Sequence, residues 1–173
     1  AAGYYESCAA DYPLLGVFLG RQYMTGRHFG PDLNKAVKLF RQASDPGSQT
    51  GEPGICASEQ AVKILAGLYL DRSIKPDGDT LKIYERAAQL GDAECAAEAA
   101  EKYWNGEGVP EDRKKAFGYY RIAADAGCTE AQRVTGICLL KGTVTKADPS
   151  AAFRYLSPAA EQSDPEALYF LGT

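Results

Sequence analysis

Small and aromatic residues recur along this chain at a spacing of 36 residues. The pair Ala87-Ala88 returns as Ala123-Ala124 and again as Ala159-Ala160. Glycines and aspartates keep the same spacing: Gly91 and Gly127, Gly106 and Gly142, Gly136 and Gly172, Asp112 and Asp148. A fixed period of this length indicates stacked copies of one small structural unit.

Each unit has the pattern of two helices joined by a turn. Between residues 93 and 104, small and apolar side chains fall on one helical face. Gly106 and Gly108 then interrupt the helix, and Asp112 is placed to cap the next one by accepting from free backbone N–H groups. One helix pair cannot bury its apolar face alone, whereas stacked pairs can. The sequence therefore predicts an all-α fold, an α-solenoid of helix-turn-helix repeats.

The period predicts a single repeat domain over residues 1–173. A stretch rich in glycine and proline, Asp45 to Gly54, lies between the first two units and favours a surface loop. The predicted parts are repeats near 12–44, 58–91, 93–127 and 129–163, a partial final repeat at 165–173, and an inserted loop at 45–57.

Composition excludes several classes of protein. Apolar residues make up 45% and charged residues 24% of the 173, which argues against wholesale disorder. The formal charge of −4 makes a nucleic-acid partner unfavourable. No apolar run is long enough to span a membrane. His28 is the one histidine, and in a turn it is expected to be solvated, so metal sites that need two histidines are excluded.

Five cysteines are present, at positions 8, 56, 95, 128 and 138. No CxxC pair occurs, which argues against a zinc site, and most of the five are expected to be small buried core residues. No serine-nucleophile motif or phosphate-binding loop is present. Glu94, Glu98 and Glu101 follow one helix face and favour a solvated surface over a catalytic carboxylate pair. We therefore predict no catalytic residue, no metal and no cofactor.

The repeated pattern is Leu-Gly-x-x-Tyr-x-x-Gly, Asp-x-x-x-Ala, an aromatic residue, then Ala-Ala-x-x-Gly. It resembles the Sel1-like repeat, a relative of the tetratricopeptide repeat, over roughly residues 14–173. The clearest copy covers residues 100–127. Ala66 and Ala100 replace the glycine of Leu-Gly, Leu139 replaces the tyrosine, and Ser163 replaces the terminal glycine.

The resemblance implies a right-handed superhelix that acts as a scaffold or adaptor. Sel1-like proteins work in bacterial envelope and polysaccharide systems, in host–pathogen contacts and in membrane-associated complexes. These settings of the family, together with a sequence that starts without Met, favour a bacterial periplasmic or other extracytoplasmic location. A cysteine-rich branch links successive repeats by a disulfide. Here Ala87 and Ala88 stand where one partner of Cys95 would be, so no such crosslink is expected.

The resemblance also implies where a partner would bind. The first helices of successive repeats line a concave groove, and the residues after the Gly and Tyr positions face it. The candidate groove residues are Arg21, Met24, Lys63, Leu70, Glu101, Trp104, Arg133, Ile137 and Leu140. Either these residues contact a protein or peptide partner, or the apolar ones among them simply pack on the adjacent helix.

Two functions remain from different classes. The first is a non-catalytic protein-interaction scaffold within a larger envelope, secretion, polysaccharide-related or signalling complex. The alternative is an enzyme or small-ligand binder that uses the 45–57 loop as a lid.

Overall fold

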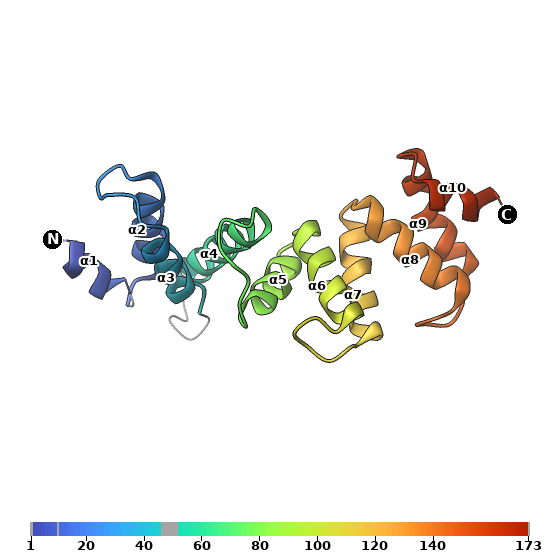
Figure 1. The fold of residues 1–173 in the computed structure, drawn as a ribbon, viewed down its shortest axis with the longest axis horizontal. Coiled ribbons are helices and arrows are strands. Elements are labelled where there is room, and N and C mark those ends of the chain that lie inside the picture. The colour runs from blue at the N-terminus through green and yellow to red at the C-terminus, as the bar shows by residue number, and fades with distance from the viewer. Residues whose placement is uncertain (1, 10, 46–51, 173) are drawn as a thin grey trace. The chain divides into compact units, whose positions relative to one another are not determined.

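The computed structural model describes residues 2–9, 11–45 and 52–172, which form ten helices and no strand (Figure 1). Their bounds are α1 (Ala2–Cys8), α2 (Pro13–Thr25), α3 (Leu33–Ser44), α4 (Glu52–Leu70), α5 (Thr80–Gln89), α6 (Ala93–Asn105), α7 (Arg113–Asp125), α8 (Thr129–Lys141), α9 (Pro149–Glu161) and α10 (Pro165–Gly172). Contacts divide the chain into two compact units, Ala1–Asp77 and Gly78–Thr173. Each unit is described by itself.

In the second unit every helix packs against the next one along the chain. α6 pairs with α7 and α8 pairs with α9, while α5 packs on α6, α7 on α8 and α10 on α9 (Figure 1). Nearest-neighbour stacking of helix pairs is the arrangement of a helical repeat array. The predicted all-α, helix-turn-helix repeat fold is confirmed.

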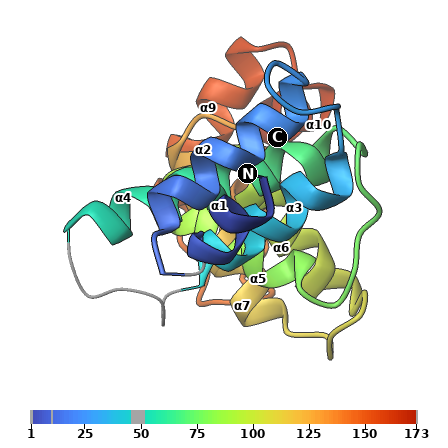
Figure 2. The ribbon, with the colours of Figure 1, turned by 90° about the vertical axis from the view of Figure 1, so that its left-hand side faces the viewer.

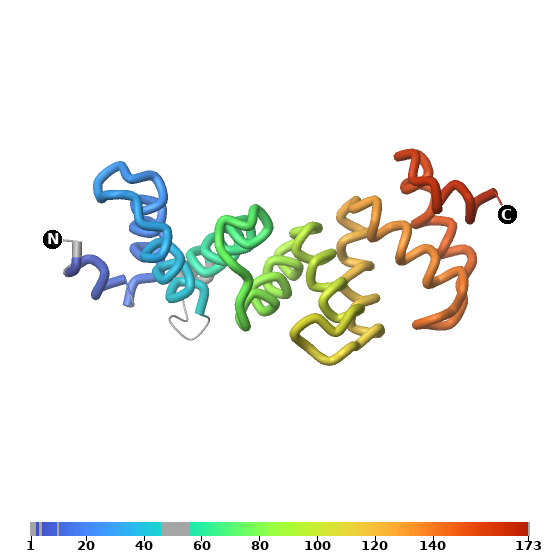
Figure 3. Tube along the Cα trace, viewed as in Figure 1, coloured from blue at the N-terminus to red at the C-terminus, as the bar shows by residue number. Residues whose placement is uncertain are grey.

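Capping residues, most of which belong to the 36-residue pattern, set the helix ends in this unit. Asp92, Asp112 and Asp148 each cap a helix by accepting from the backbone N–H three residues on, at 2.9, 2.9 and 3.0 Å. Gly106 and Gly142 follow α6 and α8 with φ of 71° and 65°, a left-handed conformation that costs glycine little. The loops at 106–112 and 142–148 therefore begin and end on repeated residues. Figure 3 traces the path of the chain through the two loops.

The core of the second unit is built mainly from alanine. One buried cluster joins α5 to α8 and consists of Ala88, Ala96, Ala100, Tyr120, Ala123, Ala124 and Ala131. A second cluster, Leu156, Ala159 and Ala167, joins α9 to α10. Short side chains let helix backbones approach closely, and a tyrosine or leucine fills the remaining space.

Gly136 lies at a close contact between α8 and α9. A Cβ atom at this position would lie 2.6 Å from Cγ of Leu156 and 3.3 Å from the carbonyl oxygen of Ala152. The first unit repeats the relation, since a Cβ at Gly20 of α2 would lie 2.5 Å from Cε1 of Phe40 of α3. At these two positions glycine leaves room for a large side chain of the paired helix.

The first unit contains α1 to α4. Figure 2 faces this end of the chain and shows α2 beside α3, the helix pair with the most extensive contact in the unit. α3 also packs on α4, α2 contacts α4, and α1 packs on α2. The buried side chains include Val17, Leu19, Tyr23, Leu39, Phe40, Val62, Leu65 and Tyr69.

The structure differs from the sequence expectation around the inserted loop at 45–57. Asp45 lies outside a helix, residues 46–51 are not among the described residues, and residues 52–57 belong to α4. Pro53 did not prevent this, because a proline in the first helical turn lacks only an N–H that has no helical partner. The single repeat domain over 1–173 stays a prediction.

Candidate functional site

Structure places the five candidate groove residues of the second unit on two successive first helices. Glu101 and Trp104 lie on α6, and Arg133, Ile137 and Leu140 lie on α8. Glu101 is exposed and the other four are half-buried. Each of the five has a different environment, which decides how much of it is available to a partner.

Trp104 uses one part of its indole for internal packing. Its ring meets Tyr120 of α7 edge to face, with 6.0 Å between ring centroids, and it packs against the alanine cluster. The guanidinium of Arg113 lies 5.5 Å from the ring centroid. Trp104 is therefore held in one orientation, and its half-buried state leaves part of the ring at the surface.

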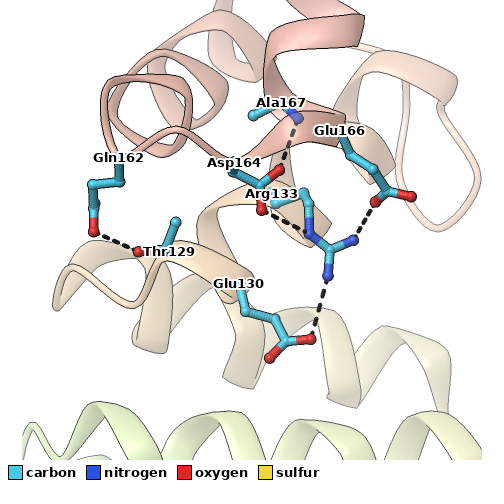
Figure 4. A network of polar contacts seen from close by, with 7 residues as sticks. All are labelled: Thr129, Glu130, Arg133, Gln162, Asp164, Glu166 and Ala167. Carbon is cyan, nitrogen blue, oxygen red and sulfur yellow. Dashed lines mark hydrogen bonds and ion pairs between the residues drawn. The ribbon is translucent and has the colours of Figure 1, made fainter.

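Arg133 joins α8 to α10. Its guanidinium pairs with Glu130 at 3.3 Å, with Asp164 at 3.4 Å and with Glu166 (Figure 4). Asp164 also caps α10 by accepting from the N–H of Ala167 at 2.8 Å. With three carboxylates around it, the positive charge of Arg133 is already neutralised inside the unit.

The two remaining α8 candidates differ from each other. Ile137 packs against the cluster of Leu156, Ala159 and Ala167, together with side chains of α10. Leu140 is half-buried near the end of α8. Ile137 thus contributes to the packing between α8, α9 and α10.

Carboxylates of α6 and α8 lie near Glu101, which precedes Trp104 by three positions on α6. Partial burial raises the pKa of Glu101, and the nearby carboxylates Glu98, Glu130 and Glu107 raise it further against the opposing effect of Lys102. Burial also raises the pKa of Tyr120 to about 12, with Glu101 and Glu130 adding to the effect. We call Glu98, Glu101, Trp104 and Glu130 the α6–α8 surface. Glu130 is paired with Arg133, whereas Glu98 and Glu101 make no ion pair among the described residues.

The first unit holds the other four candidates. Arg21 and Met24 lie on α2, where Arg21 is exposed and Met24 is 40% exposed. Lys63 of α4 is exposed and Leu70 is half-buried. Because α2 and α4 are in contact, these residues stand on neighbouring first helices.

Sequence reasoning missed a polar bridge between successive repeats. In the second unit, Glu85 of α5 accepts from Tyr103 of α6 at 2.8 Å and pairs with Lys115 of α7 at 2.8 Å. The ammonium of Lys115 also lies 4.1 Å from the ring centroid of Tyr103 and donates to its hydroxyl at 2.5 Å. Tyr119 adds a third hydrogen bond to Glu85 at 3.1 Å.

The bridge shifts the titration of its members. Burial alone would raise the pKa of Glu85, but the hydrogen bonds from Lys115, Tyr103 and Tyr119 outweigh it and lower the pKa. The hydrogen bond to Glu85 is the main cause that raises the pKa of Lys115. Burial, and then Glu85, raise the pKa of Tyr119 to about 12. The shifts of Glu85 and Lys115 favour the charged pair, and the shift of Tyr119 keeps its hydroxyl protonated as a donor.

The first unit contains two bridges of the same design. Tyr23 donates to Glu6, and Lys35 lies 4.0 Å from Glu6 and 5.3 Å from the Tyr23 ring centroid. The charges are reversed in the next bridge, where Arg41 donates to Tyr69 at 2.5 Å and pairs with Asp77. In all three bridges, a charged residue that directly follows an aromatic residue in one repeat contacts the first-helix tyrosine of the next repeat.

One feature of the sequence could have predicted two of these bridges. Lys35 and Lys115 each stand twelve positions after the tyrosine that they contact.

The cysteines form no site. All five thiols are free: Cys95 and Cys138 are buried, Cys8 and Cys128 are half-buried, and Cys56 is exposed. The expectation that most of the cysteines would be buried core residues is met only by Cys95 and Cys138. Burial, and then Asp92, raise the pKa of Cys95 far above its usual value, so this thiol is unreactive near neutral pH.

Other types of site find little support in the described parts of the chain. No group of three or more potential metal ligands occurs there, and none of the helices there combines the length and apolar character needed to cross a bilayer. A cavity of about 160 Å³ in the first unit is lined by Glu6, Lys35, Lys38, Leu39 and Gln42. It is smaller than the roughly 300–1,000 Å³ of usual ligand pockets. His28 is exposed between α2 and α3.

Comparison with known proteins agrees with this architecture. The sequence profile described as "Sel1 repeat" matches residues 17–48, 80–92, 93–128 and 129–164. A Sel1 repeat protein from Oxalobacter formigenes has a similar structure, with 26% identity, a TM-score of 0.57 and coverage of 99% of this chain and 67% of that one. A search of curated proteins gives no match.

Two further structures share the fold at lower identity. A protective antigen of uropathogenic Escherichia coli that displays an SLR fold has 22% identity and a TM-score of 0.53, over 98% of this chain and 43% of that one. Helicobacter pylori cysteine rich protein B has 17% identity and a TM-score of 0.51, over 81% and 95%. Since the profile matches more than half of the residues, the chain belongs to the Sel1 repeat family, whose members generally act as protein-interaction scaffolds.

Proposed function

We propose that the chain is a non-catalytic scaffold and that its α6–α8 surface binds a segment of a partner protein. One observation carries the proposal: Glu98 and Glu101 make no ion pair among the described residues, and the partly exposed Trp104 follows them on the same helix. Tryptophan anchors are common at protein interfaces, and charge at their edge selects the partner.

The chemistry of this surface defines the segment that would bind. Arg133 is already occupied by Glu130, Asp164 and Glu166, so it does not neutralise Glu101. A lysine or arginine of the partner would pair with Glu101 and relieve its repulsion with Glu98 and Glu130. An apolar partner residue next to that cation would cover the exposed part of Trp104.

The first unit has a comparable but different surface. Met24 and Leu70 supply apolar area, and Arg21 and Lys63 supply positive charge. We propose that this surface binds a second segment that carries acidic residues. Two surfaces of opposite charge suit a scaffold in a larger complex, and the envelope, secretion or signalling setting belongs to the same proposal.

Selection from a random peptide library displayed on phage tests the proposal with a defined probe. The full chain is immobilised, and bound peptides are resynthesised and titrated against wild type and variants. Selected peptides should combine lysine or arginine with an apolar residue, and Glu101→Lys should weaken their binding by about tenfold or more.

A matched control separates local from bulk charge. Glu161→Lys makes the same charge change on the exposed face of α9 and should change affinity by less than about twofold. Trp104→Ala should weaken binding without removing a charge, provided that its melting temperature shows a folded chain. Peptide binding that survives both Glu101→Lys and Trp104→Ala would reject the α6–α8 surface as the site.

A further inference from the structure

The solvent side of α2 carries two large apolar residues on one helical face. Leu14 is 47% exposed and Phe18 is 55% exposed. They stand four positions apart, so they lie one turn apart on the same side of the helix. Arg21, three positions after Phe18 and also exposed, continues this side. We call Leu14, Phe18 and Arg21 the α2 face, which runs for about 10 Å along the helix.

The fold does not require an apolar residue at the position of Leu14. The position lies six residues before the Gly position of the Leu-Gly element, and it is exposed in all the first helices, α2, α4, α6, α8 and α10. The other four helices carry polar residues there: Gln60, Glu94, Glu130 and Glu166. An acidic residue in the first turn interacts favourably with the helix dipole, and the first turn of α2 has none. Leu14 gives up this stabilisation while about half of its surface stays in water.

Arg21 adds a cation that no described residue pairs. Its guanidinium makes no ion pair in the described part of the chain, and the sequence of α2 contains no acidic residue. The equivalent positions of α4, α6 and α8 hold Gly67, Glu101 and Ile137, so a cation here is not a feature of the repeat. The α2 face therefore combines two apolar groups and one positive charge that the unit itself does not use.

We propose that the α2 face binds an amphipathic helix of a partner protein through two apolar residues and one acidic residue of that helix. The inference rests on the proposed scaffold function, and it names the contact face and the partner's chemistry for the first unit. Apolar side chains of the partner cover Leu14 and Phe18, and its carboxylate binds the guanidinium of Arg21 through two parallel hydrogen bonds. Anchors spaced by three or four positions are the usual contacts of one helix that lies along another surface.

Charge favours this occupant over two others. A second copy that paired its own α2 with this one has no carboxylate on that helix to offer Arg21. Stable binding to an anionic membrane surface needs a cluster of cations beside the apolar residues, whereas the α2 face has one. An acidic residue on a partner helix supplies the single charge that Arg21 lacks.

Selection of phage-displayed random peptides on the full chain tests the proposal. The phage are first depleted on the double variant Leu14→Ser with Phe18→Ser, which removes peptides for other surfaces, and are then selected on wild type. The selected peptides should contain two apolar residues three or four positions apart and an aspartate or glutamate one turn away. With labelled resynthesised peptides, fluorescence anisotropy should show binding about tenfold or more weaker for the double variant.

A double-mutant cycle tests the charged contact by itself. Arg21→Ala should weaken binding by about fivefold or more, and so should replacement of the acidic residue of the peptide by its amide. The amide peptide should lose little further affinity for Arg21→Ala, because both changes remove the same pair. Strictly additive losses would contradict the assignment of Arg21 as the contact of the carboxylate.

Matched controls make the same changes at other exposed positions. Leu33→Ser with Phe153→Ser removes one leucine and one phenylalanine that are 37% and 62% exposed, and Arg27→Ala removes another exposed arginine of the first unit. Each control should change affinity by less than about twofold. Melting temperatures check that every variant is folded, and equal losses in the control and α2-face variants would overturn the proposal.

Other occupants would also show themselves in the test. A dimer of wild type that Phe18→Ser dissociates in sedimentation, or Phe18-dependent binding to vesicles of anionic lipid without peptide enrichment, would overturn the proposal. Enriched peptides that lack an acidic residue would do the same. Peptides that depend on Glu101 without any that depend on Phe18 would reject this inference alone, whereas the absence of both kinds would reject the scaffold proposal as well.

Discussion

Glu85 on α5 and Lys115 on α7 form an ion pair of 2.8 Å across the hydroxyl of Tyr103, which belongs to the helix between them. The pair thus links two successive second helices through the first helix that separates them in sequence. Since the Glu85 side chain is only 21% exposed and receives three hydrogen bonds, the pair is shielded more than an ordinary surface pair.

A double-mutant cycle at Glu85 and Lys115 should show positive coupling. Glu85→Gln alone should lower the free energy of unfolding by about 1–2 kcal/mol, because it weakens charge-assisted hydrogen bonds. The coupling energy between Glu85→Gln and Lys115→Met should be about 0.5–1 kcal/mol. Urea unfolding of the four proteins measures it, and strictly additive losses would show that the two side chains act independently.

The effect of pH should have opposite signs at Glu85 and Glu101. The lowered pKa of Glu85 adds stability that is present above its unfolded value and lost as pH falls through the folded one. The raised pKa of Glu101 means that its charge costs stability at neutral pH, and protonation removes this cost. Glu85→Gln should therefore destabilise at pH 7 and Glu101→Gln should stabilise.

Both differences from wild type should fade in acid, where the two carboxyl groups are protonated in the folded and unfolded chain alike. Unfolding curves recorded from neutral pH down to about pH 3 measure this. Two variants whose effects share one sign at neutral pH would contradict the environments described for these residues.

Two glycine-to-alanine substitutions in the second unit should differ in sign. Gly136→Ala should lower stability by about 1–3 kcal/mol, because the new Cβ would overlap Leu156. Gly118→Ala in α7 meets no heavy atom within 4 Å, so it should raise stability by about 0.5–1 kcal/mol through better helix propensity. Thermal melts of the two variants provide the comparison, and a neutral Gly136→Ala would show that α8 and α9 separate easily.

Ser163→Gly should stabilise the chain. Ser163 has φ of 65°, in the left-handed region, at the repeat position where Gly91 and Gly127 also have positive φ. Removing the side chain relieves strain of about 1 kcal/mol, less the entropy that glycine loses on folding. Ser150→Gly at the start of α9 is the matched control and should destabilise slightly. A melting temperature unchanged by Ser163→Gly would argue that the strain is absorbed elsewhere.

Sequence could predict the repeat fold because each helix end carries its own signal. Asp112 and Asp148 begin α7 and α9, Gly106 and Gly142 end α6 and α8, and all four follow the same period. The start of α4 was missed because its first turn contains proline and glycine, residue types that are also typical of loops.

The candidate surface was harder to predict, because a first helix has neighbours on more than one side. Register alone put Arg133 in a groove, but Asp164 and Glu166 of the following helix neutralise it. Ile137 likewise packs on Leu156 and α10. The Glu85 bridge depends on residues from three helices. The Arg41 bridge has the reversed charge and depends on α3, α4 and Asp77 of the loop after α4. Residue types at a fixed spacing do not show such a pattern.

The reversed signs of successive bridges mean that the repeats are not interchangeable. The repeat that carries Lys115 needs an acidic residue at the bridge position of the preceding repeat. The repeat that carries Asp77 needs a basic residue there. Shuffling or duplicating whole repeats would set like charges against each other at the new junctions. The charges of the bridges thus favour one order of the repeats, independently of the alanine contacts between neighbouring repeats.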